Sequence, residues 1–225
     1  GAPVARDGTV PAVFALRAGR ERVPAGAAMG AYEVRRDEPS EWEAWDIQRD
    51  SLMESRTWGQ ATIGRADIDS RGAAVVHTSL HSPAADIETS ITLLPTEAQL
   101  RFSCDVDWRG DEQFLKVDIP VALTAKTAHY ECQYGTVERP VVKNTAADEA
   151  MFESCTHRFV YLAEQGYAVG IANASTYGSD AFPIHADRDS GRQAGAVMRL
   201  SPGSYTHSEL PTQRVGGISE TGVAL

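Results

Sequence analysis

Apolar and polar residues alternate along two consecutive stretches in the middle of the chain, at residues 100–108 and 115–123. A period of two places successive side chains on opposite faces of a strand, so that one face lies in a core and the other in water. We therefore expect two strands joined by a turn at residues 109–111, with Lys116 and Asp118 facing the solvent. The expected core positions are Phe102, Val106, Trp108, Val117 and Ile119.

Four further segments combine strand-forming residues with short turn-like connections: residues 73–80, 87–94, 128–134 and 166–172. Helix is expected only at residues 40–43, where Ser40 and Glu43 have the spacing of a capping box, and at residues 146–153. Residues 1–11 and 203–225 are rich in Gly, Pro, Ser and Thr, and we expect both ends to be irregular. This order of elements predicts an all-β fold, an antiparallel β-sandwich with little helix, as one domain over residues 1–225.

The composition and charge narrow the classes of partner. Apolar residues make up 42% and charged residues 23% of the chain, as in an ordinary globular protein. A formal net charge of −10 repels phosphate backbones and anionic lipid, so we expect no nucleic-acid partner and no membrane partner. Three cysteines without a C-x-x-C pair favour reduced thiols, and hence a cytoplasmic protein.

Two pairs of polar residues have spacings that occur in metal or catalytic sites. His77 and His81 are four residues apart, but the residues around them are those of a strand, and no Glu lies between the two. Asp105 and Asp107 share one face of their strand, as the paired carboxylates of a glycosidase would. The solvated face of an amphipathic strand explains both pairs, so we expect no metal ligand and no catalytic residue in this chain.

Aromatic residues stand beside carboxylate, amide and guanidinium groups in two places. One group comprises Trp42, Trp45 and Asp46, and the other is the segment YECQYGTVER at residues 130–139. These side-chain types bind sugars, since aromatic faces and planar polar groups together match a sugar's surface. The same residues also fit an arrangement in which the tryptophans fill the core and Glu138 and Arg139 form a surface pair. The side-chain chemistry leaves both interpretations open.

Three segments resemble motifs of the glycoside hydrolase family 38 α-mannosidases, in the same order and spacing. They are DEPSEWEAWDI at residues 37–47, similar to D-x-P-x-x-W/Y-D-A-W-D-I/V, then YECQYGTVERPVVKNT at residues 130–145, similar to Y-E-x-Q-F-G-x-x-x-R-P-T-H-x-N-T, and residues 152–178, similar to F-E-x-x-x-H-K/R…G-Y-G-V…N-D-x-K-Y-G. The resemblance implies the C-terminal β domain of such an enzyme, a sandwich of the galactose-mutarotase-like type (a supersandwich).

The resemblance also implies where the chemistry of the parent enzyme lies. In that family an N-terminal barrel carries the zinc ion and the catalytic carboxylates, so this chain is expected to be inactive alone and to hold no cofactor. Its implied partners are the catalytic domain of the same chain and a mannose-containing glycan. Glu138, Arg139 and Asn144, on an expected loop over residues 135–144, become candidates for facing the barrel or its sugar. The aromatic and polar cluster adds Trp45 and Asp46 to these candidates.

The chain departs from the family motifs at two of their polar positions. The family's Thr-His after R-P is Val141-Val142 here, and its N-D-x-K-Y-G is NASTYG at residues 173–178. These departures leave open a parent with an altered substrate or a purely structural region. Two other functions also stay open: an independent carbohydrate-binding module, and a mutarotase-like enzyme acting on free sugars. The latter would depend on His129, His157 and Glu131.

Overall fold

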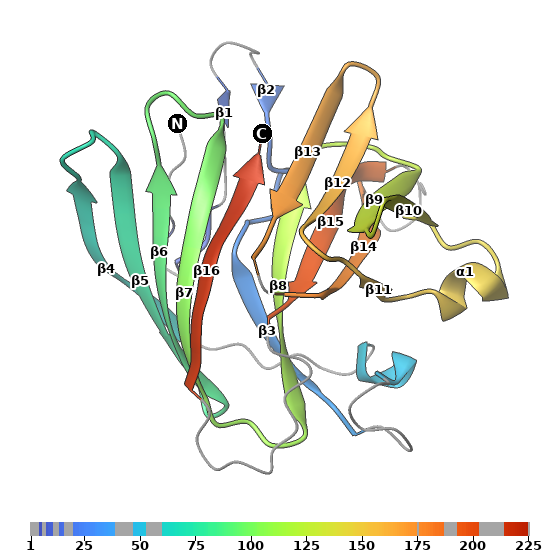
Figure 1. Cartoon of the computed structure of the whole chain (residues 1–225), viewed down its shortest axis with the longest axis horizontal. Coiled ribbons are helices and arrows are strands. Elements are labelled where there is room, and N and C mark those ends of the chain that lie inside the picture. The colour runs from blue at the N-terminus through green and yellow to red at the C-terminus, as the bar shows by residue number, and fades with distance from the viewer. Residues whose placement is uncertain are drawn as a thin grey trace.

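The chain forms two main antiparallel β-sheets, one of nine strands and one of five (Figure 1). The computed structural model describes residues 5, 8–10, 14–15, 20–38, 47–52, 60–174, 176–186, 193–202 and 214–224. Side chains of the two sheets meet in a shared hydrophobic core. The predicted antiparallel β-sandwich with little helix is therefore confirmed.

The nine-stranded sheet joins two runs of strands in the order β10-β9-β12-β13-β16-β7-β6-β5-β4. One run comprises β4 (Gln60–Ile68), β5 (Ala74–His81), β6 (Ala85–Leu93) and β7 (Gln99–Trp108). The other comprises β9 (Thr127–Cys132), β10 (Gly135–Pro140), β12 (Phe159–Glu164) and β13 (Tyr167–Ala172).

The strand that connects the two runs is β16 (Arg214–Ala224), which pairs with β7 on one side and β13 on the other. The expectation of an irregular C-terminal end is wrong for these residues. Turn-forming residues do not prevent pairing here, because the strand lies between two sheet edges whose backbone groups need partners. Two register shifts against β7 accommodate the irregular sequence.

The five-stranded sheet has the order β11-β14-β15-β8-β3. Its members are β3 (Ala31–Arg36), β8 (Gln113–Val121), β11 (Ser154–Cys155), β14 (Gly178–His185) and β15 (Gln193–Ser201). A separate two-stranded ribbon pairs β1 (Phe14–Ala15) with β2 (Arg20–Glu21). In Figure 1, β3 and β8 lie near the centre of the view with β14 and β15 to their right, whereas β4 and β5 form the left end.

The core between the sheets agrees with the alternation in β7 and β8. Phe102, Val106 and Ile119 are buried as predicted. Trp108 and Val117 are only partly buried and pack at the margins of the core clusters. Trp108 is the last residue of its strand, where one side is less covered, and Val117 lines a small cavity.

Helix is short in the described residues, with a 3-10 turn η1 (Arg49–Leu52) and a helix α1 (Ala146–Ala150). The helix predicted at residues 146–153 ends early because the chain enters β11 four residues later. The helix predicted at residues 40–43 lies outside the described residues. None of the described helices has the length and apolar content to cross a membrane. The three cysteines are free thiols.

Candidate functional site

The predicted site residues on the segment 135–144 lie on a strand and a helix start rather than on one loop. Glu138 and Arg139 belong to β10, which pairs with β9 through a turn at Gln133 and Tyr134. The expected loop over residues 135–144 is therefore wrong for residues 135–140, because the hairpin continues the backbone pairing of β9. The left-handed backbone of the turn is at Tyr134, with φ 68°, and not at Gly135. Trp45 and Asp46 lie outside the described residues.

Glu138 and Arg139 point to opposite faces of β10, so one ligand on one face cannot contact both. Glu138 is opposite His129 in the register, and its Oε1 atom lies 3.7 Å from His129 Nδ1. Arg139 is opposite Ala128, whose side chain is buried on the core face. Its Nη1 atom donates to the carbonyl of Glu138 at 3.2 Å, and no described carboxylate forms an ion pair with it.

Asn144 lies just before α1 and helps to begin that helix. Thr145 is the N-cap, and its side chain accepts a hydrogen bond from the backbone of Asp148 while the Asp148 side chain accepts one in return. The backbone N–H of Asn144 also donates to Asp148, at 3.3 Å. The Thr145 hydroxyl, followed by these backbone donors, lowers the pKa of Asp148. Within the described part of the chain, the exposed Asn144 side chain donates to the Val142 carbonyl, at 3.4 Å.

A row of side chains crosses four strands on the outer face of the nine-stranded sheet, the face turned away from the core. The register aligns Glu138 of β10, His129 of β9, Tyr161 of β12 and Gly170 of β13. The rings of His129 and Tyr161 stack with centroids 4.5 Å apart and planes within 5°. Phe159, 38% exposed, lies beside Tyr161 with centroids 6.2 Å apart. The sequence does not reveal this row, because the pattern of residues 159–164 did not predict a strand.

A second polar cluster lies on the outer face of the five-stranded sheet and is buried. Lys116 has no exposed side-chain surface, and its Nζ atom donates to both carboxylate oxygens of Glu153, at 2.7 and 2.6 Å. It also lies 3.5 Å from Asp180. The expectation that Lys116 faces the solvent is therefore wrong, and Asp118 is half-buried as well. The alternation identified the non-core face correctly but could not reveal that other residues cover it.

Arg199 holds the other half of this cluster together. Its Nε atom donates to Asp118 at 2.6 Å, and its other nitrogens lie 3.8 Å from Glu33 and 3.8 Å from Asp180. Burial, together with repulsion from Glu153 and Asp118, raises the pKa of Asp180 despite the nearby cations.

The turn η1 helps to cover this cluster. Arg35 donates to Glu33 at 2.6 Å and to the carbonyl of Leu52, the last residue of η1. Over the described residues the cluster contains three cations and four carboxylates: Arg35, Lys116 and Arg199 against Glu33, Asp118, Glu153 and Asp180.

The two pairs weighed as metal or catalytic groups lie on a solvated face. His77 and His81 are exposed on β5 and contact Ser90 and Asp86, at 3.0 and 2.9 Å. Asp105 and Asp107 are exposed on β7. In the part of the chain that the structure describes, no group of three or more His, Cys, Asp or Glu side chains is placed to hold a metal ion.

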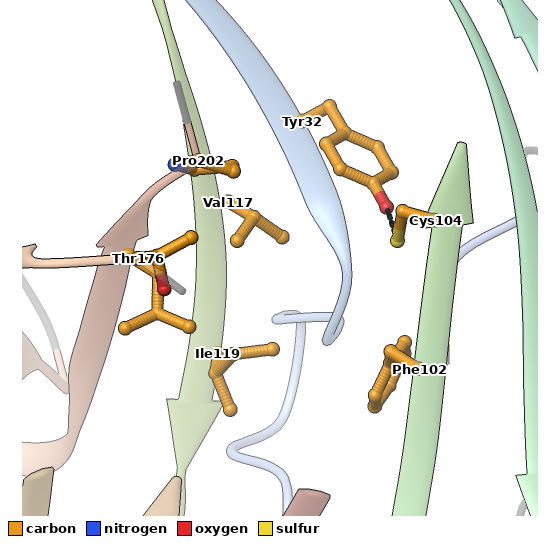
Figure 2. A pocket seen from close by; sticks show the side chains of 8 residues that line it. Tyr32, Phe102, Cys104, Val117, Ile119, Thr176 and Pro202 are labelled. Carbon is orange, nitrogen blue, oxygen red and sulfur yellow. Dashed lines mark hydrogen bonds between the residues drawn. The ribbon is translucent and has the colours of Figure 1, made fainter. Parts of the chain in front are cut away.

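A small apolar cavity lies between the sheets and is too small for a sugar. Its volume is about 20 Å³, which is room for one water molecule. Figure 2 shows Tyr32, Phe102 and Cys104 on one side of it, with Val117 and Ile119 opposite. The Tyr32 hydroxyl and the Cys104 sulfur are hydrogen-bonded at 2.7 Å, and burial raises the pKa of both groups. These groups are part of the core.

Known proteins agree with this architecture over most of the chain. The family model for the glycosyl hydrolases family 38 C-terminal domain matches residues 3–201. The chain is 31% identical to alpha-mannosidase 2C1 of Homo sapiens over 176 residues, which is 76% of this chain and 17% of that protein. It is 31% identical to the alpha-mannosidase of Saccharomyces cerevisiae over 173 residues, which is 73% of this chain and 15% of that protein.

Solved structures show the same fold at low sequence identity. A glycosyl hydrolase family 38 protein from Enterococcus faecalis aligns with a TM-score of 0.64 and 12% identity, over 99% of this chain and 28% of that one. A 4-alpha-glucanotransferase from Thermococcus litoralis aligns with a TM-score of 0.53 and 11% identity, over 99% and 35%. This chain spans less than a fifth of the length of each of the two alpha-mannosidases from Homo sapiens and Saccharomyces cerevisiae.

Proposed function

Because the chain belongs to glycosyl hydrolase family 38 through that family's C-terminal domain, we propose that it packs on the catalytic domain of a longer α-mannosidase-type hydrolase and helps to shape its sugar site. Alone it hydrolyses nothing, and the parent's zinc ion is held by the catalytic domain. The glycan that the parent binds contains mannose. The three free thiols support a cytoplasmic location for the protein.

One observation carries the docking part of this proposal: β4 exposes apolar side chains on the core side of its sheet. Ile63 is 40% and Ile68 is 70% exposed. The register places Ile63 opposite Thr78, which is buried. Leu80, two residues further along β5, packs against the core. Ile63 and Ile68 therefore share the face that is buried elsewhere in the sheet, yet both are exposed, on the edge strand at the left end of Figure 1.

The opposite face of β4 is polar, which makes the strand amphipathic. Thr62 and Arg65 are exposed there, and Asp67 pairs with Arg65. An edge strand with an uncovered apolar face favours association, since burying that face removes apolar area from water. The occupant we propose is the catalytic domain of the same chain. Its support is that the matched relatives are several times longer than this chain.

Thiol labelling tests this docking surface. A cysteine introduced as Ile68→Cys, in a Cys155→Ser background that removes the exposed native thiol, should react quickly in the 225-residue chain and at least tenfold more slowly in the full-length protein. Thr62→Cys on the opposite face is the matched control and should react at similar rates in both proteins. Equal labelling rates of Ile68→Cys in the 225-residue chain and in the full-length protein would contradict the proposal. Slow labelling of the 225-residue chain that depends on its concentration would instead identify a second copy as the occupant.

Arg139 is the residue that we propose to reach the sugar site of the catalytic domain, and Asn144 is the second candidate. Arg139 is half-buried, and most of its guanidinium N–H groups have no partner among the described residues. A planar donor group of this kind suits a carboxylate or a pair of sugar hydroxyls. Glu138 points to the other face of β10 and does not share this role.

Arg139→Ala should lower kcat/KM of the full-length protein on an aryl α-mannoside at least tenfold, about 1.4 kcal/mol of lost transition-state stabilisation. The melting temperature should change little, because among the described residues the Arg139 side chain donates to a neighbouring carbonyl and forms no ion pair. Arg158→Ala, an exposed arginine just before β12, is the control and should keep full activity. Unchanged activity together with a lower melting temperature for Arg139→Ala would make Arg139 a structural residue.

A further inference from the structure

The row Glu138–His129–Tyr161–Gly170 leaves one face of an aromatic ring open. Tyr161 has two cross-strand neighbours, His129 on β9 and Gly170 on β13. Its ring stacks on His129, with planes within 5°, so its other face is turned toward Gly170. Gly170 has no side chain to fill that space. Among the described residues, this arrangement indicates a slot with the Tyr161 ring as its wall and the backbone of β13 as its floor.

The described residues beside Gly170 on this face of β13 are small. Ala168 and Ala172 are the next residues on the same face of β13, and both are small and exposed. Phe159 extends the aromatic wall along β12. A Cβ atom at Gly170 would lie 3.4 Å from the Cβ of Tyr161, which is an ordinary contact. The backbone there is not in the left-handed region, so the glycine is not required by the fold.

We propose that this slot binds the apolar face of a neutral pyranose ring. The C–H groups of a sugar carry partial positive charge and stack on the negative face of an aromatic ring. His129, held in the stack near the Glu138 carboxylate, supports the Tyr161 ring from behind. The net charge of −10 on the chain disfavours an acidic sugar by repulsion. The site needs only this domain and does not depend on docking to a catalytic domain.

NMR titration of the 225-residue chain with methyl α-D-mannopyranoside tests the site. One stacked ring should give a Kd on the order of 1 mM, and the shifted amides should be those of β12 and β13. Sodium glucuronate, the acidic probe, should bind at least tenfold more weakly. No saturable shift at β12 and β13 for the neutral sugar, or equal binding of the acidic one, would overturn the proposal.

Two variants separate sugar binding from folding. Tyr161→Ala removes the wall and should weaken binding at least tenfold, whereas Tyr161→Phe keeps the wall and should retain it. Gly170→Val fills the slot and should abolish binding while the melting temperature stays level or rises, since β-branched residues suit strands better than glycine does. Ser103→Val, on the same outer face of the sheet but on β7, is the control and should bind normally. Normal binding by Gly170→Val would place the sugar elsewhere.

Discussion

The strands β7 and β8 follow each other along the chain and have the same alternation, yet their polar faces lie in different surroundings. On β7, Asp105 and Asp107 are exposed. The Nη1 atom of Arg109 lies 3.4 Å from Oδ2 of Asp107, and both side chains are exposed to solvent. On β8, Lys116 is fully buried and Asp118 half-buried, both within a cluster of charges. The same pattern of apolar and polar residues therefore leads to a solvated face in one sheet and to a buried ionic layer in the other.

The difference arises from what covers each face. Glu153, from the segment before β11, and η1 lie over the outer face of the five-stranded sheet. Once covered, each charge loses its hydration, and only close, opposite charges offset that cost. Cations and carboxylates accordingly alternate across β14, β15 and β8, as Asp180, Arg199 and Asp118. The alternation in a strand identifies the face that packs in the core. Whether the other face is solvated depends on whether further segments of the chain cover it.

The largest expected effect is that of Lys116→Met, which keeps the size of the side chain and removes its charge. Glu153 and Asp180 would then be buried without their shared cation, so we expect a loss of about 3–5 kcal/mol in the free energy of unfolding. Urea denaturation of the 225-residue chain measures it. Asp105→Asn on β7 is the matched control and should change stability by less than about 0.5 kcal/mol.

The double variant Lys116→Met with Glu153→Gln sharpens this test. Removing the carboxylate that loses its partner should recover part of the stability, because the two side chains interact directly. A loss in Lys116→Met no larger than that in Asp105→Asn would contradict the buried ionic layer. It would mean that water reaches Lys116 and that β7 and β8 do not differ.

The sequence predicted the two central strands with clear alternation and missed several others, among them β4, β12 and β15. Alternation located β7 and β8, but the buried pattern of β15 extends over nearly its whole length, because its outer face carries Arg199 in the ionic layer. For the candidate site, the sequence proposed Glu138 and Arg139 together but did not reveal that β10 separates them onto opposite faces. The stacked row depends on the register of β9, β12 and β13, which is set by tertiary pairing and cannot be obtained from local patterns.

A smaller effect, visible mainly as a pH dependence, is expected for Asp180→Asn. Burial, followed by the repulsion of Glu153 and Asp118, raises the pKa of Asp180 above its ordinary value of 3.8, although Lys116 and Arg199 oppose the shift. A carboxyl group whose folded pKa is raised contributes stability that is fully present below its ordinary pKa and is lost as the pH rises through the raised value. An amide does not titrate, and its presence would leave three cations against three carboxylates. The wild-type chain should therefore lose stability relative to Asp180→Asn as the pH increases, and the variant should be at least as stable near neutrality.

Unfolding free energies of both chains from about pH 3 to about pH 8 measure this difference in stability. Asp107→Asn, which alters a hydrated carboxylate on β7, is the control and should give a much smaller trend. The stability difference between Asp180→Asn and the wild type could instead stay constant, or grow in favour of the wild type, as the pH rises. Either result would show that the fold stabilises the Asp180 charge. The ionic layer would then accommodate a charge as readily as the solvated face of β7 does.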